Sequence, residues 1–163
     1  MLDYSNLNVT IQDLEELNIA ALEYVGEYEG NDNIVDKMLY EILKWAVPAK
    51  IFNFPKKTKL ISIYPQRQEE KRLIFGITIE KTVTPPEHIK KVRIDSGKYA
   101  VARFEVESHE FQQAWKLLYR WISENGYTPQ QKPPYEIQHN DSCKHPEKKH
   151  IVDICVPITK VKK

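Results

Sequence analysis

The chain has 163 residues, a length that corresponds to one domain or to two small copies of one motif. Its 24 basic and 23 acidic side chains nearly cancel, so no net positive field is available to hold a phosphate backbone, and we expect no direct nucleic acid binding. The N-terminal segment has neither the basic nor the apolar region of a signal peptide, and no apolar run approaches the ~18 residues of a membrane span. The sequence therefore predicts a cytoplasmic protein without a membrane partner.

The first half of the chain predicts a strand, a helix and two further strands. The strand-like runs are rich in β-branched and aromatic residues, and the helix is indicated by apolar residues at helical spacing. Pro48 then ends this helix. In chain order, the elements are a strand within 19–30, a helix from about Ile34 to Trp45, and a β-hairpin of strands within 59–66 and 71–82 around the charged turn 67–70.

The same order of elements returns in the second half. The stretch 83–88 contains two prolines and no periodicity, and we interpret it as a linker. Beyond it, a helix within 108–129 is expected to begin near Ser108, with Glu110 as a capping partner, and to stop at Gly126. The strands of this half lie within 88–107, with a break at Ser96 and Gly97, and within 134–141 and 150–159.

Short segments of the two halves match one another in the same order, 74 to 80 residues apart. The matched pairs are IAALEY (19–24) with YAVARF (99–104), KMLYEIL (37–43) with KLLYRWI (116–122), ISIY (61–64) with YEIQ (135–138), and IFGITI (74–79) with IVDICV (151–156). We therefore expect one domain over 1–163, composed of repeat 1 at about 7–82, the linker 83–88 and repeat 2 at about 89–160.

The expected fold belongs to the α+β class. A single β-α-β-β unit has only one helix to cover its apolar face and leaves a sheet edge open, so edge-to-edge pairing of two copies resolves both problems. The predicted product is a curved antiparallel sheet of tandem duplicated β-α-β-β units, with two main helices on one side. A ligand groove is expected where the halves meet, either on the face opposite the helices or at the seam between the helices.

Glu136 is a charged residue within the predicted strand KPPYEIQHND. Because strand side chains alternate, Glu136 and Gln138 share one face, while Tyr135 and Ile137 take the other. Glu136 is then either a solvated strand residue or the one charge that lines a cleft. Ser62 occupies the equivalent position in the first half, so the two copies differ here, and such differences are where function is expected.

Four segments of the chain match a known family in their order and spacing. They are GKYAVARFEV (97–106), YRWISENGYTP (119–129), PPYEIQHND (133–141) and IVDICVPIT (151–159). With these segments the sequence resembles the GyrI-like small-molecule-binding proteins, which include the effector-binding domains of AraC-type and MerR-type multidrug regulators. The resemblance covers nearly the whole chain and implies a tandem β-α-β-β fold. It implies a standalone effector-binding module, since no helix-turn-helix segment precedes the first predicted strand.

In that family, a glutamate of the motif YEIY lies in an aromatic cleft for lipophilic, often cationic compounds, and by position it corresponds to Glu136. The resemblance therefore implies lipophilic cationic small molecules as partners. A carboxylate in a water-poor cleft is costly unless a cation compensates it, which explains such a preference. Gln138 stands where the family commonly has tyrosine, and Trp121 lies off the predicted apolar stripe of its helix. The candidate aromatic walls are Tyr64, Tyr99, Trp115, Tyr119 and Trp121.

Two other functions remain open. Some GyrI-like proteins resemble hydrolases of strained electrophiles, and in such an enzyme Glu136 would activate water with help from the hydroxyl of Tyr99 or Tyr64. Other family members resemble inhibitors that bind DNA gyrase, which requires a protein-binding surface rather than a cleft. A regulator or gyrase is therefore a further candidate partner.

The stretch 139–150 is rich in residue types that bind metals in other proteins. They are His139, Asp141, Cys143, His145 and His150. Their spacing belongs to no common zinc motif, and such residues are routine in a polar turn, so we expect no metal and no cofactor. Cys143 and Cys155, the two cysteines, are expected to be free thiols.

Overall fold

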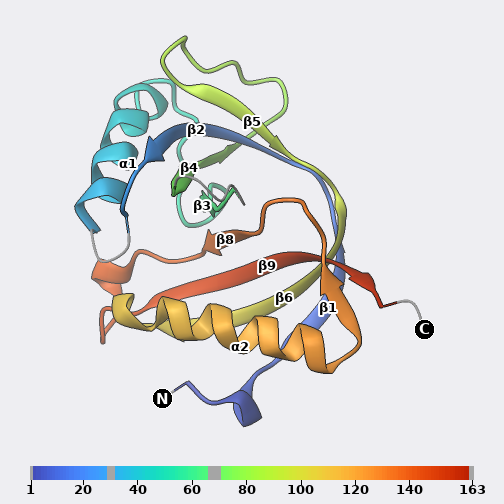
Figure 1. Cartoon of the computed structure of the whole chain (residues 1–163). Coiled ribbons are helices and arrows are strands. Elements are labelled where there is room, and N and C mark those ends of the chain that lie inside the picture. Colours follow the sequence, from blue (N-terminus) through green and yellow to red (C-terminus); the bar gives the residue numbers. More distant parts are fainter. Residues whose placement is uncertain (1, 29–31, 66–70, 162–163) are drawn as a thin grey trace.

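The computed structural model describes residues 2–28, 32–65 and 71–161, in which nine antiparallel strands form one curved sheet (Figure 1). Two helices accompany the sheet in these ranges, α1 (Asp32–Ala46) and α2 (Phe111–Glu124). The strands are β1 (Val9–Leu14), β2 (Leu17–Val25), β3 (Leu60–Ile63), β4 (Arg72–Ile79), β5 (Lys90–Ile94), β6 (Gly97–Val106), β7 (Tyr127–Pro129), β8 (Tyr135–Gln138) and β9 (His150–Lys160).

The two halves of the sheet meet at its centre, where β3 pairs with β8. The order across the sheet is β1-β6-β9-β8-β3-β4-β2-β5, and β7 pairs with β9 outside this path. In the central pair, Ser62 lies directly opposite Glu136, so the two positions that the alignment of the halves makes equivalent are neighbours. The predicted α+β class and the hairpin of β3 and β4 are confirmed.

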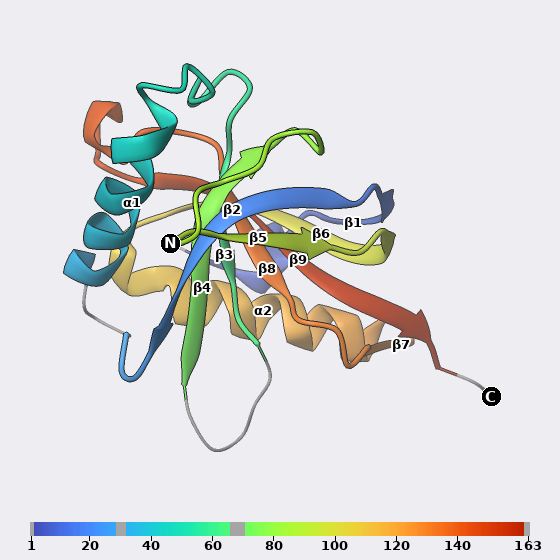
Figure 2. The same ribbon diagram turned by 90° about the horizontal axis from the view of Figure 1, so that it is seen from above.

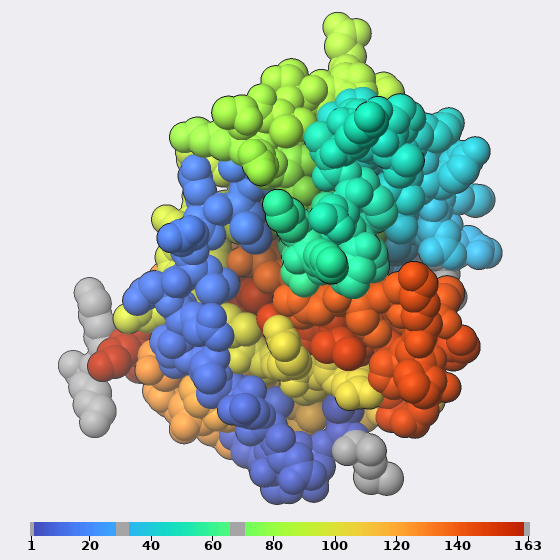
Figure 3. All heavy atoms as spheres, turned by 180° about the vertical axis from the view of Figure 1, so that it is seen from behind, coloured from blue at the N-terminus to red at the C-terminus, as the bar shows by residue number. Residues whose placement is uncertain are grey.

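Two long, bent strands connect the halves of the sheet. Only two residues separate β1 from β2, and only two separate β5 from β6. β1 pairs with β6 and β2 with β5 in one continuous register, which runs from Val9 opposite Ala102 to Ala21 opposite Lys90. Figure 3 shows this first bent strand, in blue, running along the back of the molecule. Each half therefore supplies an edge strand to the other half.

Several element boundaries differ from the sequence-based expectations. β1 has no counterpart among the elements predicted from the sequence. The segment 88–107 is predicted as one strand of the second half, whereas its first part, β5, is an edge strand of the first half. The second helix is preceded by a 3₁₀ turn, Ser108–Glu110, in which Glu107 rather than Ser108 forms the capping box with Glu110. The expected linker 83–88 contains neither helix nor strand, and the turn 67–70 lies outside the described residues.

Both helices pack against the same face of the sheet, as predicted. α2 packs on β6 and β9 through Ala114, Leu118 and Ile122, which are fully buried. α1 packs on β2, β3 and β4 through residues that include Met38 and Ile42. Figures 1 and 2 show the two helices over different parts of the sheet, α2 along β6 and β9 and α1 beside β2. In the described ranges no helix is long and apolar enough to cross a membrane.

A third apolar cluster lies on the opposite face of the sheet. Its members alternate along the strands with those that face the helices: on β6, for example, Tyr99 belongs to this cluster and Ala100 to that of α2. Cys155 is buried here as a free thiol, and Cys143 is an exposed free thiol. The face away from the helices is therefore filled by the protein's own side chains.

Candidate functional site

Glu136 lies in β8, in the middle of the sheet, between the halves that carry α1 and α2 (Figure 1). Its neighbours Tyr135 and Ile137 pack on the face away from the helices, so alternation along the strand directs Glu136 to the helix side. On the adjacent strands its partners are Ser62 and Ile154. Only 7% of Glu136 is exposed, so it is a buried charge and not a solvated strand residue.

Two side chains donate hydrogen bonds to the Glu136 carboxylate. The Nε1–H group of Trp115 on α2 donates to Oε1 at 2.5 Å. The hydroxyl of Tyr64, which follows β3, donates a second hydrogen bond. Both donors are neutral, and no Lys, Arg or His in the described ranges contributes to the interactions that set the pKa of Glu136. The carboxylate is therefore hydrogen-bonded, but no positive charge from the described residues compensates it.

Four aromatic side chains pack together beside this carboxylate, and we call them the aromatic cluster. They are Tyr28, Tyr64, Trp115 and Tyr119. Tyr64 meets Trp115 edge to face with ring centroids 5.4 Å apart, and Trp115 stacks on Tyr119 at 6.0 Å. Tyr28 lies 5.9 Å from Tyr64. Rings at these distances are in direct contact with one another.

Burial raises the pKa of Glu136 to about 7, although the hydrogen bonds from Trp115 and Tyr64 act to lower it. The group is therefore divided between acid and carboxylate near neutral pH. Burial also raises the pKa of the Tyr64 hydroxyl well above its ordinary value, and the nearby Glu136 adds to this rise. Tyr64 consequently remains a neutral hydrogen-bond donor.

Tyr99, the residue expected to line the cleft or to assist catalysis, lies on the other face of the sheet. It is 1% exposed, and its ring meets Tyr135 edge to face at 5.6 Å. Its hydroxyl donates to the carbonyl oxygen of Asp95 at 3.0 Å. The sheet therefore separates Tyr99 from the Glu136 carboxylate.

Trp121, another of the candidate walls expected from the sequence, also lies away from Glu136. Its ring stacks on Tyr127 of β7, with centroids 6.2 Å apart and planes 11° from parallel. It packs at the edge of the α2 core. Of the six residues selected from the sequence, the structure brings four together: Glu136, Tyr64, Trp115 and Tyr119.

Tyr28 is the member of the aromatic cluster that sequence reasoning missed. It follows Gly26, whose φ of 135° turns the chain at the end of β2. The sequence places Tyr28 in a run of alternating Glu and Tyr with nothing to indicate a contact with Tyr64, which is 36 positions later. Only the tertiary structure reveals that contact.

The potential metal ligands within 139–150 do not gather around one point, and two of the histidines form separate hydrogen bonds. His139 bonds to Asp153 at 2.8 Å, and Asp153 also receives two hydrogen bonds from Arg103, at 2.8 and 3.0 Å. His145 bonds to Glu105 at 2.6 Å. Among the described residues, no group of three or more His, Cys, Asp or Glu side chains is arranged to hold a metal ion.

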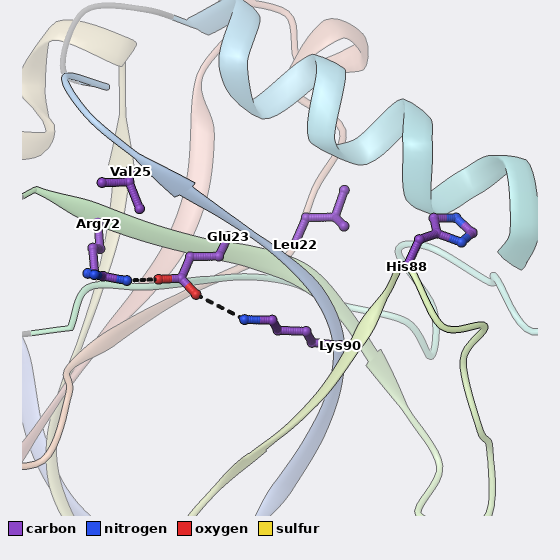
Figure 4. Close-up of a pocket in the computed structure, with 6 residues that line it drawn as sticks. All are labelled: Leu22, Glu23, Val25, Arg72, His88 and Lys90. Carbon is purple, nitrogen blue, oxygen red and sulfur yellow. Dashed lines mark hydrogen bonds and ion pairs between the residues drawn. The ribbon is translucent and has the colours of Figure 1, made fainter.

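A separate hollow of about 420 Å³ lies at the end of β2, next to β4 and β5 (Figure 4). It is lined by Leu22, Glu23, Val25, Arg72, His88 and Lys90. Glu23 accepts hydrogen bonds from Arg72 and, at 3.3 Å, from Lys90, so these charges already compensate one another. The hollow includes no residue of β8 or α2. We therefore assign the candidate site to Glu136, a buried carboxyl group that no cationic side chain of the described ranges compensates.

Comparison with known proteins gives one family over most of the chain. The family model described as "GyrI-like small molecule binding domain" matches residues 7–159. The chain is 25% identical over 158 residues to the "SPbeta prophage-derived putative transcriptional regulator YosT" of Bacillus subtilis (strain 168). That match covers 93% of this chain and 99% of the Bacillus protein.

Solved structures share the fold at low sequence identity. The C-terminal domain of EcmrR has a TM-score of 0.79 and 14% identity, and the match covers 96% of this chain and 99% of that one. The structure of SAV2435 bound to tetraphenylphosphonium has a TM-score of 0.62 and 16% identity, and covers 93% and 94% of the two chains. Together with the family match, the curved sheet and two helices show that this chain belongs to the GyrI-like small-molecule-binding family.

Proposed function

We propose that the protein is an effector-binding protein that selects lipophilic cations through Glu136. The observation that carries this proposal is the burial of the Glu136 carboxyl group, which is 7% exposed and has only the neutral donors Trp115 and Tyr64 in the described ranges. Ionisation of such a group is costly, and a cationic ligand would offset the cost. A neutral or anionic ligand of the same shape would not.

The aromatic cluster supports the lipophilic part of this specificity. Aromatic faces attract a cation by about 0.5 to 2 kcal/mol per well-placed ring. The rings are tyrosine and tryptophan side chains on three different segments, which allows them to move apart and repack around ligands of different shape. The ligand would occupy the seam between α1 and α2, above the centre of the sheet.

The relatives support both the ligand class and the biological role. The solved structure of SAV2435 contains tetraphenylphosphonium, a lipophilic cation. The name of the Bacillus relative describes it as a "putative transcriptional regulator". By extension, this chain would bind a lipophilic cation as an effector, and its bound state would be communicated to a partner.

A thermal-shift titration with two isosteric ions tests the proposal. Tetraphenylphosphonium should raise the Tm of the wild type, because a ligand bound only to the native state stabilises it by mass action. The anion tetraphenylborate has the same shape and should produce a much smaller shift. In Glu136→Gln the affinity for the phosphonium should fall at least about tenfold, corresponding to ~1.4 kcal/mol. Equal shifts by the two ions in the wild type would contradict charge selection at Glu136.

Hydrolysis is a second candidate function, because Glu136 has a pKa of about 7 and a hydrogen bond from the Tyr64 hydroxyl. A general base works best when its pKa lies near the operating pH. Turnover of a strained electrophile such as styrene oxide, measured in the wild type, Glu136→Gln and Tyr64→Phe, tests this function. Product formation by the wild type that both variants lose would support hydrolysis. Equal product formation by all three proteins would contradict it.

A further inference from the structure

We propose that Glu136 binds its cation in exchange for a proton, so that the empty site holds a carboxylic acid and each bound cation releases one proton. This inference rests on the proposed function at the same site. In the exchange, the O–H bond of the acid breaks, its proton passes to solvent water, and the carboxylate keeps the electron pair and pairs with the ligand. Net charge is conserved, because one positive charge enters the site as another leaves it.

The contacts of Glu136 support the protonated state of the empty site. Its carboxyl group lies 7% exposed at the centre of the sheet, with Ser62 opposite on β3 and Ile154 opposite on β9. Its donors, Trp115 and Tyr64, carry no charge. No side chain in the described ranges supplies the positive charge that a buried carboxylate needs, so a proton or a ligand has to supply it.

The other titratable groups that we place near Glu136 in the described structure are phenols and one thiol. Tyr64 is hydrogen-bonded to it, Tyr28 contacts Tyr64, Tyr119 stacks on Trp115 from α2, and Cys155 lies nearby on β9. Phenols and thiols are neutral at pH 7, and burial raises the pKa of Tyr64 and of Cys155 further.

The charged groups of the neighbouring elements are directed elsewhere. On β9, Asp153 is held by Arg103 and His139. On α1, Glu41 pairs with Lys44 at 2.9 Å. The exposed charged residues of the two helices are Asp36, Lys37, Lys44, Lys116, Arg120 and Glu124. Glu136 is therefore the buried carboxyl group of this region of the described structure, and its pKa of about 7 lies between pH 6 and pH 8.

The proton exchange predicts a defined dependence of affinity on pH. With a pKa of about 7, Glu136 is mostly protonated at pH 6 and mostly ionised at pH 8. A permanent cation pairs with the ionised form, so its apparent affinity should rise about tenfold between these two pH values and level off above them. A neutral ligand would show no such rise.

Isothermal titration calorimetry of the wild type with tetraphenylphosphonium tests the exchange directly. Each titration is performed at pH 6, 7 and 8 in pairs of buffers that differ in ionisation enthalpy, because the enthalpy difference between buffers counts the protons released. We expect about 0.9 proton per cation at pH 6 and about 0.1 at pH 8, from the pKa of about 7. Glu136→Gln has no proton to exchange, so its residual binding should be independent of pH and of buffer.

The outcomes separate this inference from the proposed function. Phosphonium binding to the wild type with equal affinity at pH 6 and pH 8 and no proton release would overturn the exchange, while cation binding would stand. No binding at any pH would overturn the proposed function together with the exchange. Proton release that persists in Glu136→Gln would assign the proton to another group and would also overturn the inference.

Discussion

The indole of Trp115 on α2 donates a hydrogen bond to the carboxylate of Glu136 in β8, and thereby links a helix to the centre of the sheet. The indole satisfies a buried charge that has no cationic partner among the described residues. It also covers that charge as a member of the aromatic cluster. Under the proposed function, a ligand cation would compete with Trp115 for the carboxylate of Glu136.

Replacing Trp115 with phenylalanine should destabilise the protein more at pH 8 than at pH 5. The substitution keeps an aromatic ring but removes the Nε1–H donor, and loss of a hydrogen bond to a buried carboxylate costs about 1 to 3 kcal/mol. At pH 5 Glu136 is protonated and uncharged, so loss of the Nε1–H donor should cost less stability. Urea denaturation at the two pH values measures the difference. Trp121→Phe is the matched control, since Trp121 stacks on Tyr127, and its effect should not depend on pH in this range.

Replacing Glu136 with glutamine should increase the free energy of unfolding at pH 8. In the native state the pKa of Glu136 is raised from 4.5 to about 7, so between these values the native state binds more protons than the unfolded state. The free energy of unfolding of the wild type therefore falls by up to about 3 kcal/mol as pH rises through this window. Glu136→Gln has no carboxyl group at this position, so its free energy of unfolding does not fall for this reason. Denaturation curves of both proteins at pH 4.5 and pH 8 provide the measurement.

The control for this comparison is Glu87→Gln, which changes an exposed glutamate in the linker. Its effect on stability should be small at both pH values. If the stability difference between Glu136→Gln and the wild type were the same at pH 4.5 and pH 8, Glu136 would titrate normally in the native state.

Replacing Asp153 with asparagine should destabilise the protein at pH 7 by about 1 to 3 kcal/mol, because it breaks the bonds to Arg103 and His139. Burial acts to raise the pKa of Asp153, but these two partners hold it at about 2. Its contribution to stability is therefore present above its ordinary pKa of 3.8 and is lost as pH falls through about 2.

Acid-dependent unfolding of this variant and the wild type tests that assignment. The stability difference between them should shrink as pH falls from 4 towards 2. Asp13→Asn, which alters an exposed aspartate of β1, should show no such convergence. A difference that stayed constant down to pH 2 would show that the ionised form of Asp153 is not what stabilises the protein.

The sequence predicted the position of Glu136 because that position depends on local alternation and on the match between halves. Ser62 and Glu136 were equivalent in the alignment, and they are neighbours at the centre of the sheet. The apolar stripe of each helix was nearly as clear in the sequence, but the exact alignment of one helix with the other was not. Burial of Ile34, Met38 and Ile42 matches that of Ala114, Leu118 and Ile122 at an offset of 80, one more than the letters of the two helices suggested.

The remaining features depend on contacts between distant segments. The register of β6 with β1 and β9 decides whether Tyr99 or Ala100 faces the helices. That register cannot be read from the sequence alone. The packing of Trp121 depends on Tyr127 in a strand of three residues. β1 and β5 each pair with the other half of the chain, so adjacency in sequence misassigns them.

The most direct test of the central claim is a crystal structure of the protein with tetraphenylarsonium, whose arsenic atom is located by anomalous scattering. We expect an arsenic peak between α1 and α2, next to the carboxylate of Glu136, with the rings of Tyr64 and Trp115 moved apart to contact the phenyl groups. A peak in the hollow at Glu23, Arg72 and Lys90, with Trp115 still bonded to Glu136, would contradict it.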